Sequence, residues 1–464
     1  LNWRFIMNNN LGNKITFLSL IRYTTPTVIM MVFISLYTII DGLFISNYVG
    51  SNALSSTNII FPVVNFILGI GVMLGSGGSA IVAMFLGANK EKEARQSFSL
   101  LLLTSIIIGI IVAVFGVVNL KQIIYMLGST ENLYNDCYKY GFIMLIFAPV
   151  IMTKMFFDVF FVTAGKPKLG LTCAILGGVT NIILDYIFIT KYNMGVSGAA
   201  LATCIGNFIT FIVGIIYFLN KNSYLHIERP KFKLSVILKS CTNGISEMIT
   251  QLSSAITTFL YNIAMLKFIG EDGVAAITIV LYAQFLLVSA YLGFTSGVLP
   301  RISYNYGKKD NKELHKIIKY SFTFILILAV SIFVISKLLS EFLVSVFTGD
   351  NIAVYNITLQ GFNIFSIGFL FSGFNIFTIG MFTAFSNGKI SGLLSILRTL
   401  VLFLVGIYIL PLMFQVNGVW LVVPFCEVLT ILLSIFFIFK WIKDNHSNFI
   451  DYYNYRYYQE TSYK

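Results

Sequence analysis

The chain has 464 residues, of which 57% are hydrophobic and only 11% are charged, and its mean hydropathy is +0.85. Such a composition excludes an ordinary soluble domain and predicts an all-α polytopic membrane protein. The net charge of +12 could suit a nucleic acid, but the basic residues lie in short segments between apolar runs, as in membrane proteins. No nucleic-acid partner is therefore expected.

Apolar stretches long enough to span a bilayer, which takes about 20 residues, recur along the whole chain. We expect twelve spans, at about 18–46, 54–86, 97–119, 138–162, 169–190, 197–219, 238–268, 275–304, 316–340, 354–385, 390–412 and 418–442. Most Lys and Arg residues, Arg301 and Arg398 counted among them, fall in the loops of one side. Because basic loops stay inside, we expect a multi-pass protein of the cell (plasma) membrane with both termini in the cytoplasm.

The two halves of the chain resemble each other when one is shifted by 220 residues. This shift aligns several short motifs, namely 48–50 with 268–270, Gly77 with Gly297, Gly87 with Gly307, Gly141 with Gly361, and 196–198 with 416–418. Two homologous six-helix bundles that enter the membrane in the same sense should be related by a pseudo-twofold axis along the membrane normal. We therefore expect lobes at 1–219 and 238–443, a cytoplasmic linker at 220–237 and a cytoplasmic tail at 444–464.

Two acidic residues, Asp41 and Asp185, lie inside predicted spans of the first lobe. Asn181 precedes Asp185 by one helical turn, so the two side chains share a face. A charged residue at this depth costs about 2.5–3.5 kcal/mol unless it faces protein or water, which favours a functional role. Thr203 and Asn207, one turn apart on the next span, could add neutral oxygens. The pattern predicts a cation site.

Three further acids are weaker candidates for an accessory role. Asp158 follows Lys154 by one turn, so it either forms a local ion pair or takes part in function. Glu247 stands near the start of the seventh span. Glu427 is the repeat partner of Asn207.

Nothing in the sequence points to an enzyme. There is no Gly-x-x-x-x-Gly-Lys-Ser/Thr motif, no loop long enough for a nucleotide-binding domain, and no catalytic His or Cys constellation. We expect no cofactor beyond a coupling ion.

At these residues the chain resembles the multidrug and toxic compound extrusion (MATE) family, above all its bacterial drug exporters of the staphylococcal, clostridial and DNA-damage-inducible branches. The resemblance lies in Pro26 and Asp41 of the first span, Asn181-x-x-x-Asp185 of the fifth and the segment 198–203 of the sixth. It implies V-shaped lobes and an antiporter that exports lipophilic organic cations in exchange for Na⁺ or H⁺, here a monomer.

The resemblance also implies roles for individual residues. The cation site would consist of Asp41, Asn181, Asp185 and Thr203, and these would be metal ligands only if the ion is Na⁺. The helix that carries Pro26 would bend. Na⁺ and H⁺ are not separated by the sequence, because carboxylates could hold either.

Two other functions were weighed. A lipid-linked precursor flippase shares the repeat and the fold of the wider superfamily, but lipid phosphates would call for several cationic residues in the cavity, and the spans offer little beyond Lys154. A membrane sensor or scaffold gives no reason for buried acids in a duplicated bundle.

Overall fold

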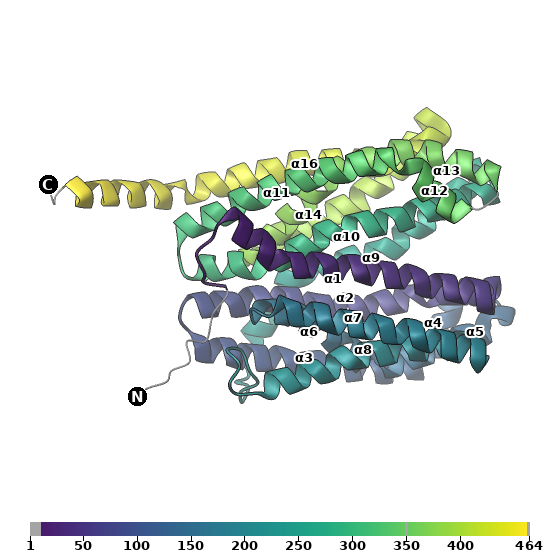
Figure 1. Ribbon diagram of the computed structural model, residues 1–464, viewed down its shortest axis with the longest axis horizontal. Coiled ribbons are helices and arrows are strands. Elements are labelled where there is room, and N and C mark those ends of the chain that lie inside the picture. The colour runs from purple at the N-terminus through teal and green to yellow at the C-terminus, as the bar shows by residue number, and fades with distance from the viewer. Residues whose placement is uncertain (1–10, 349–350, 462–464) are drawn as a thin grey trace.

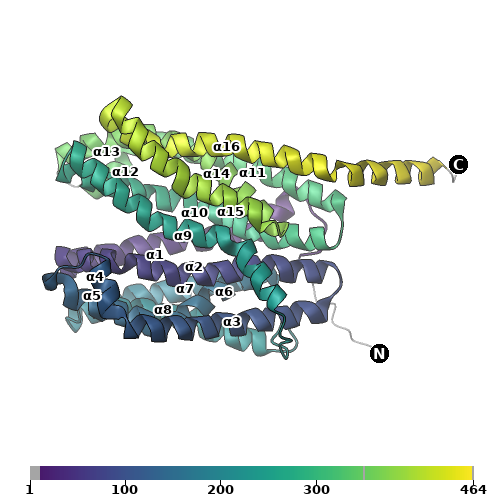
Figure 2. The ribbon, with the colours of Figure 1, turned by 180° about the vertical axis from the view of Figure 1, so that it is seen from behind.

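The computed structural model describes residues 11–348 and 351–461, which contain helices and no strand. Figures 1 and 2 show two bundles lying side by side, one built by the first half of the chain and one by the second. The N lobe holds α1 (Phe17–Phe44), α2 (Ser51–Gly87), α3 (Glu91–Val118), α4 (Leu120–Met126), α5 (Glu131–Ile146), α6 (Ala148–Thr163), α7 (Pro167–Asp185) and α8 (Val196–Leu219), with π-helical turns η1 (Ile45–Val49) and η2 (Tyr186–Lys191) after α1 and α7.

The C lobe begins four residues earlier than predicted. It holds α9 (Leu234–Phe268), α10 (Glu271–Gly307), α11 (Asn311–Leu338), α12 (Ser340–Thr348), α13 (Ile352–Phe365), α14 (Phe369–Ala384), α15 (Gly388–Ile396) and α16 (Leu402–Thr461), with a 3-10 turn η3 (Ser366–Gly368) and a π-helical turn η4 (Leu397–Val401). The helix α16 continues beyond the bundle through most of the predicted tail, as Figure 1 shows at its left. Residues 462–464 lie outside the described part.

The helices agree with twelve spans only when three irregularities are recognised. Nine stretches of the described chain are single helices long and apolar enough to cross a bilayer, and α5 with α6 makes a tenth that is bent by 57° at Phe147. One of the nine, Gly388–Lys443, is two spans, because Gln415 breaks α16 with a φ of 50°. The twelfth is α9, which is 35 residues long but carries many polar side chains.

Backbone turns reveal where the two halves correspond. Gly50 and Gly270 have positive φ before α2 and α10, which are both 37 residues long, and these positions are 220 apart. The positive-φ residues Gly165 and Ser386, after α6 and α14, are instead 221 apart. Helices α5–α7 therefore match α13–α15 at a shift of 221, because the stretch from the start of α12 to the start of α13 is one residue longer than its N-lobe counterpart.

This local shift corrects one predicted alignment. The repeat partner of Gly141 is Phe362 and not Gly361. The shift returns to 220 at α8, since Gly195 and Gln415 have matching left-handed backbones, with φ of 57° and 50°. The predicted pairing of Asn207 with Glu427 thus agrees with the backbone.

The lobes meet where α2 packs on α9 and α10, and where α1 packs on α10. Glycines let the backbones approach. A Cβ at Gly87 would collide with the carbonyl of Tyr304, and a Cβ at its repeat partner Gly307 would collide with the carbonyl of Met84. The two glycines make equivalent contacts across the pseudo-twofold axis, so close packing of the lobes depends on small residues at this crossing.

The segment before α1 also joins the lobes. Leu11 is buried in the core of the N lobe, and Ile15 is buried in a core cluster of the C lobe. The amide of Ile15 donates to Oε2 of Glu313 at 3.2 Å. The start of the described chain therefore bridges both bundles.

Candidate functional site

The strongest candidates come together between α1 and α7. Asp41 lies near the end of α1, and Asn181 and Asp185 lie one turn apart on α7, just before the π-helical turn η2. Asp185 and Asn181 are 0% and 2% exposed, while Asp41 is partly buried. The two carboxyl groups interact with each other. The structure thus brings together three of the four residues of the predicted cation site.

The oxygens of this cluster lack donors. Among the described residues, none makes a well-formed hydrogen bond to Oδ1 of Asp41, to either carboxylate oxygen of Asp185 or to Oδ1 of Asn181, although the amide of Asn181 lies close enough to the Asp185 carboxyl to interact with it. The amide nitrogen of Asn181 donates to Oγ1 of Thr203 at 3.4 Å, which turns the amide oxygen away from Thr203. Buried acceptors without donors are costly, and a proton or a hard cation such as Na⁺ would satisfy them. The donor set fits either ion.

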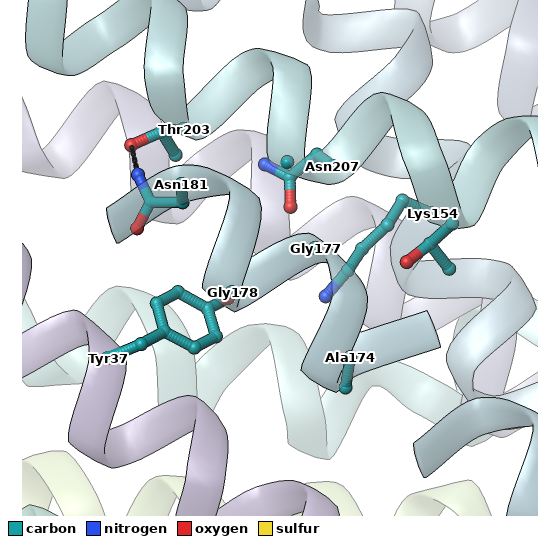
Figure 3. Close-up of a pocket in the computed structure, with 10 residues that line it drawn as sticks. Tyr37, Lys154, Ala174, Gly177, Gly178, Asn181, Thr203 and Asn207 are labelled. Carbon is teal, nitrogen blue, oxygen red and sulfur yellow. Dashed lines mark hydrogen bonds between the residues drawn. The ribbon is translucent and has the colours of Figure 1, made fainter. Parts of the chain in front are cut away.

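A small cavity adjoins the acid pair, with a volume of about 10 Å³, the lower limit for one water molecule. Asn181 and Thr203 border it, whereas Asp41 and Asp185 do not line it. Figure 3 shows Lys154 and Asn207 pointing towards this space beside Gly177. Its full lining consists of Tyr37, Lys154, Ala174, Gly177, Gly178, Asn181, Thr203, Gly206, Asn207 and Thr210.

Lys154 and Asp158 form the local ion pair that their spacing allowed. Their N···O distance is 2.7 Å, both side chains are buried, and both belong to α6. Oδ1 of Asp158 has no hydrogen-bond donor among the described residues. Tyr37 lies within electrostatic range of both this pair and Asp41.

The two remaining acids, Glu247 and Glu427, belong to the C lobe and do not join this site. Glu427 binds Arg398 through three contacts of 2.6–3.1 Å and accepts a hydrogen bond of 2.7 Å from Asn375. Glu247, on α9, is partly buried and lies within electrostatic range of Arg398.

Two basic residues assigned to cytoplasmic loops lie inside helices instead. Arg398 is part of η4 and reaches Glu427, and Arg301 is a buried residue of α10. The guanidinium of Arg301 lies 3.9 Å from the ring centre of Tyr23, whose hydroxyl donates to the carbonyl of Val162 at 2.7 Å. Both residues also fall within the predicted spans 275–304 and 390–412, which agrees with their place in helices, and the side of the membrane assigned to them stays a prediction.

The helix α1 runs through Pro26 without interruption. Neighbouring hydroxyls bond to backbone carbonyls around the proline: Thr25 donates to Ile21 at 2.8 Å, and Thr27 donates to Thr24 at 2.6 Å. Such bonds help membrane helices to tolerate proline. A bending role for Pro26 stays a prediction.

Sequence reasoning missed the tyrosines around the acids. Tyr140 of α5 interacts electrostatically with Asp41 and Asp185, and Tyr282 of α10 interacts with Asp41 from the other lobe. The Tyr282 hydroxyl also lies 3.6 Å from the point that a Cβ at Gly42 would occupy. Tyr37 could have been found as the residue one turn before Asp41, but Tyr140 and Tyr282 have no such local signal.

Comparisons with known proteins agree with this architecture. The MatE family model matches residues 26–187 and 246–409. The multidrug export protein MepA of Staphylococcus saprophyticus subsp. saprophyticus is 24% identical over 418 residues, covering 87% of this chain and 88% of that protein. MepA of Staphylococcus aureus strain MRSA252 is 24% identical over 422 residues, with the same coverage.

Solved structures show the same fold. An outward-facing multidrug resistance MATE family transporter superposes with a TM-score of 0.87 at 22% identity, over 92% of this chain and 96% of that one. A MATE in complex with MaL6 superposes with a TM-score of 0.88 at the same identity and coverage. The predicted all-α fold of twelve spans in two lobes is confirmed.

Proposed function

Because this chain belongs to the MATE family, we propose that it is a multidrug exporter that drives lipophilic organic cations out of the cell in exchange for Na⁺ or H⁺. The ion would bind in the N lobe at Asp41, Asn181, Asp185 and Thr203. The protein would act as a monomer in the cell membrane, with both termini in the cytoplasm. The loops at 88–90 and 308–310, which carry Lys residues, lie at the same end of the molecule as the start of α1 and the last turns of α16, and this supports the orientation.

The observation that carries the proposal is that the buried carboxylate oxygens without a hydrogen-bond donor among the described residues, those of Asp41, Asp158 and Asp185, all belong to the N lobe. A cation bound there would neutralise charge in a region of low dielectric and favour one arrangement of the lobes. A drug bound between the lobes would favour the other arrangement. By linkage, each ligand must then weaken the binding of the other, which is the requirement for exchange.

The test is ethidium efflux from vesicles that contain the purified protein, driven separately by a Na⁺ gradient at constant pH and by a proton gradient. Transport driven only by the Na⁺ gradient would indicate that the cluster binds a metal ion. Transport driven only by the proton gradient would indicate that the carboxyl pair binds and releases a proton. The variant Asp41→Asn/Asp185→Asn should lose transport under both gradients. Asp272→Asn, an exposed acid in the first turn of α10, is the matched control and should transport normally.

Unchanged efflux in well-expressed Asp41→Asn/Asp185→Asn would refute the mechanism. If neither gradient moved ethidium in the wild type while a lipid-linked substrate did move, the protein would be a flippase.

A further inference from the structure

The cavity of the N lobe has a counterpart in the C lobe that is filled by side chains. At the shift of 221 that relates α6 and α7 to α14 and α15, Lys154 corresponds to Asn375, and Gly177 corresponds to Arg398. Lys154 and Gly177 both border the N-lobe cavity. Their counterparts Asn375 and Arg398 both contact Glu427.

Glu427 completes the correspondence. It matches Asn207, a third residue that borders the N-lobe cavity, at the shift of 220 that relates α8 to the second part of α16. Three positions around a space in one lobe are therefore three members of a contact network in the other. Gly177 has no side chain in the N lobe, whereas its C-lobe partner Arg398 has a long one.

The C-lobe network is saturated with hydrogen bonds. Nε and Nη2 of Arg398 donate to both oxygens of Glu427, and the amide of Asn375 donates to Oε2 of Glu427 at 2.7 Å. Oδ1 of Asn375 accepts from Ser434 at 3.1 Å. The side chains of Arg398 and Glu427 are only 12% and 5% exposed. Paired charges of this kind neutralise each other inside the lobe.

The balance of charge therefore differs between the lobes. In the N lobe the carboxylates of Asp41 and Asp185 face each other, and their oxygens lack donors among the described residues. In the C lobe the carboxylate of Glu427 is already paired with the guanidinium of Arg398 at 2.6 Å. One lobe needs a cation from solution and the other contains its own.

We propose that Arg398 is a permanent counter-cation, which occupies in the C lobe the place of the N-lobe cavity and confines cation exchange to the N lobe. This inference rests on the proposed function, since it specifies which half of the exporter couples to the ion. Arg398 is a positioning residue that acts through Glu427. The charged and titratable groups that face the pair from neighbouring helices are Glu247 of α9, near Arg398, and Tyr291 of α10, near Glu427.

The test measures how Na⁺, and separately pH, changes the thermal unfolding temperature in detergent, with choline as the ionic control. The background is Asp41→Asn/Asp185→Asn, so that the two acids of the proposed ion site contribute nothing, while Asp158 stays paired with Lys154 in every protein compared. With Arg398 intact, this protein should show no rise of Tm with added Na⁺ or with falling pH. Adding Arg398→Ala should create such a rise, of about 4 °C or more at saturating cation, because Glu427 then needs an external partner.

The matched control is Arg398→Met/Glu427→Gln in the same background, which removes both charges and leaves none unpaired. It should fold and show no cation-dependent rise. If Arg398→Ala folds and its Tm is insensitive to both ions, Arg398 only fills space and the proposal is wrong.

If Arg398→Ala does not fold, the proposal is tested by comparing the Asp41→Asn/Asp185→Asn background protein with its Arg398→Met/Glu427→Gln derivative. A cation-dependent rise in the background protein that disappears in Arg398→Met/Glu427→Gln would show that the C lobe exchanges an ion itself, and would overturn the proposal. Absence of a rise in both would support it. Two different results would show that the proposed function itself is wrong. The Tm of the wild-type protein would not change with Na⁺ or pH, and efflux would be unchanged in Asp41→Asn/Asp185→Asn.

Discussion

Both lobes contain acids in their interior, but the surroundings of these acids differ between the lobes. In the N lobe, Asp41 and Asp185 approach each other and their oxygens lack donors within the described chain. In the C lobe, Glu427 is held by Arg398 and Asn375 with every contact at 3.1 Å or less. A duplicated scaffold thus keeps an unsatisfied polar site in one half and a satisfied one in the other.

The difference separates a functional role from a structural one. Buried polar groups that satisfy one another fix a packing arrangement, whereas unsatisfied groups persist where a ligand completes them. The comparison predicts that charge removal will harm stability in the C lobe and function in the N lobe.

The largest expected effect follows from breaking the C-lobe pair. Glu427→Gln leaves the buried guanidinium of Arg398 without a carboxylate and should cost about 3–5 kcal/mol of folding free energy. The Tm of the protein in detergent should then fall by about 3–5 °C, since a chain of this length has an unfolding entropy of about 1 kcal/mol/K. Asp185→Asn, the corresponding removal of a buried charge in the N lobe, should not lower Tm.

Arg398→Met/Glu427→Gln is the control for this experiment, and it should recover most of the loss because no charge is left unpaired. Equal losses for Glu427→Gln and Asp185→Asn would contradict the distinction between the lobes.

A medium effect is expected at Thr203 of the N-lobe site. Thr203→Val removes the acceptor of the Asn181 amide, which should cost about 1–3 kcal/mol and weaken binding of the coupling ion about tenfold. The measurement is the concentration of Na⁺ or H⁺ that gives half-maximal ethidium efflux.

The repeat partner of Thr203 is Val423, so Val423→Thr is the reciprocal exchange and should leave the half-maximal concentration unchanged. An equal shift in both variants would mean that Thr203 acts through general packing.

The smallest effect concerns the first turn of α3 and α11, which begin at equivalent positions. Asp310 caps α11 by accepting from the amide of Glu313 at 3.2 Å, while its partner Lys90 makes no side-chain cap of α3. Asp310→Ala should therefore cost about 1 kcal/mol. Lys90→Ala should cost almost nothing, and both are measured by the shift in Tm.

The contribution of this cap should also depend on pH. Partial burial acts to raise the pKa of the Asp310 carboxyl, but the hydrogen bonds from the Glu313 amide and the Lys308 ammonium outweigh it and hold the pKa below its ordinary value. A lowered pKa means that the stabilisation is complete above the unfolded pKa, about 3.9, and is lost as pH falls through the folded value. The Tm difference between wild type and Asp310→Ala should thus vanish in acid. A difference that persists at low pH would show that the cap does not depend on charge.

Much of the fold could be predicted because its signals are local. Apolar runs mark most helices, and the glycines at 50 and 270 mark equivalent turns. The sequence was less informative at two places. The helix α9, which packs against the other lobe, carries many polar side chains and is less apolar than its neighbours. The break at Phe147, inside the N lobe, divides one predicted span.

In the candidate site, too, local contacts could be predicted from the sequence and contacts between distant segments could not. Asn181 and Asp185 share a face through helical spacing, and Lys154 and Asp158 pair for the same reason. The contact between Arg398 and Glu427 joins residues 29 apart on separate helical segments, so no periodicity could reveal it. Contacts between distant segments depend on tertiary packing, and only the structure supplies them.

The pairing of Arg398 with Glu427 has a consequence for the response of the protein to membrane voltage. Carrying one elementary charge through 100 mV is worth about 2.3 kcal/mol. Because the C-lobe pair has no net charge, motion of that lobe carries none from this cluster through the field. Under the proposed function, the N-lobe site without its ion would carry the negative charge of the Asp41 and Asp185 carboxylates, and a negative cell interior would push that charge outward. A bound monovalent cation would offset one unit of this charge, so the voltage would act differently on the loaded and the unloaded carrier, and it would do so through the N lobe.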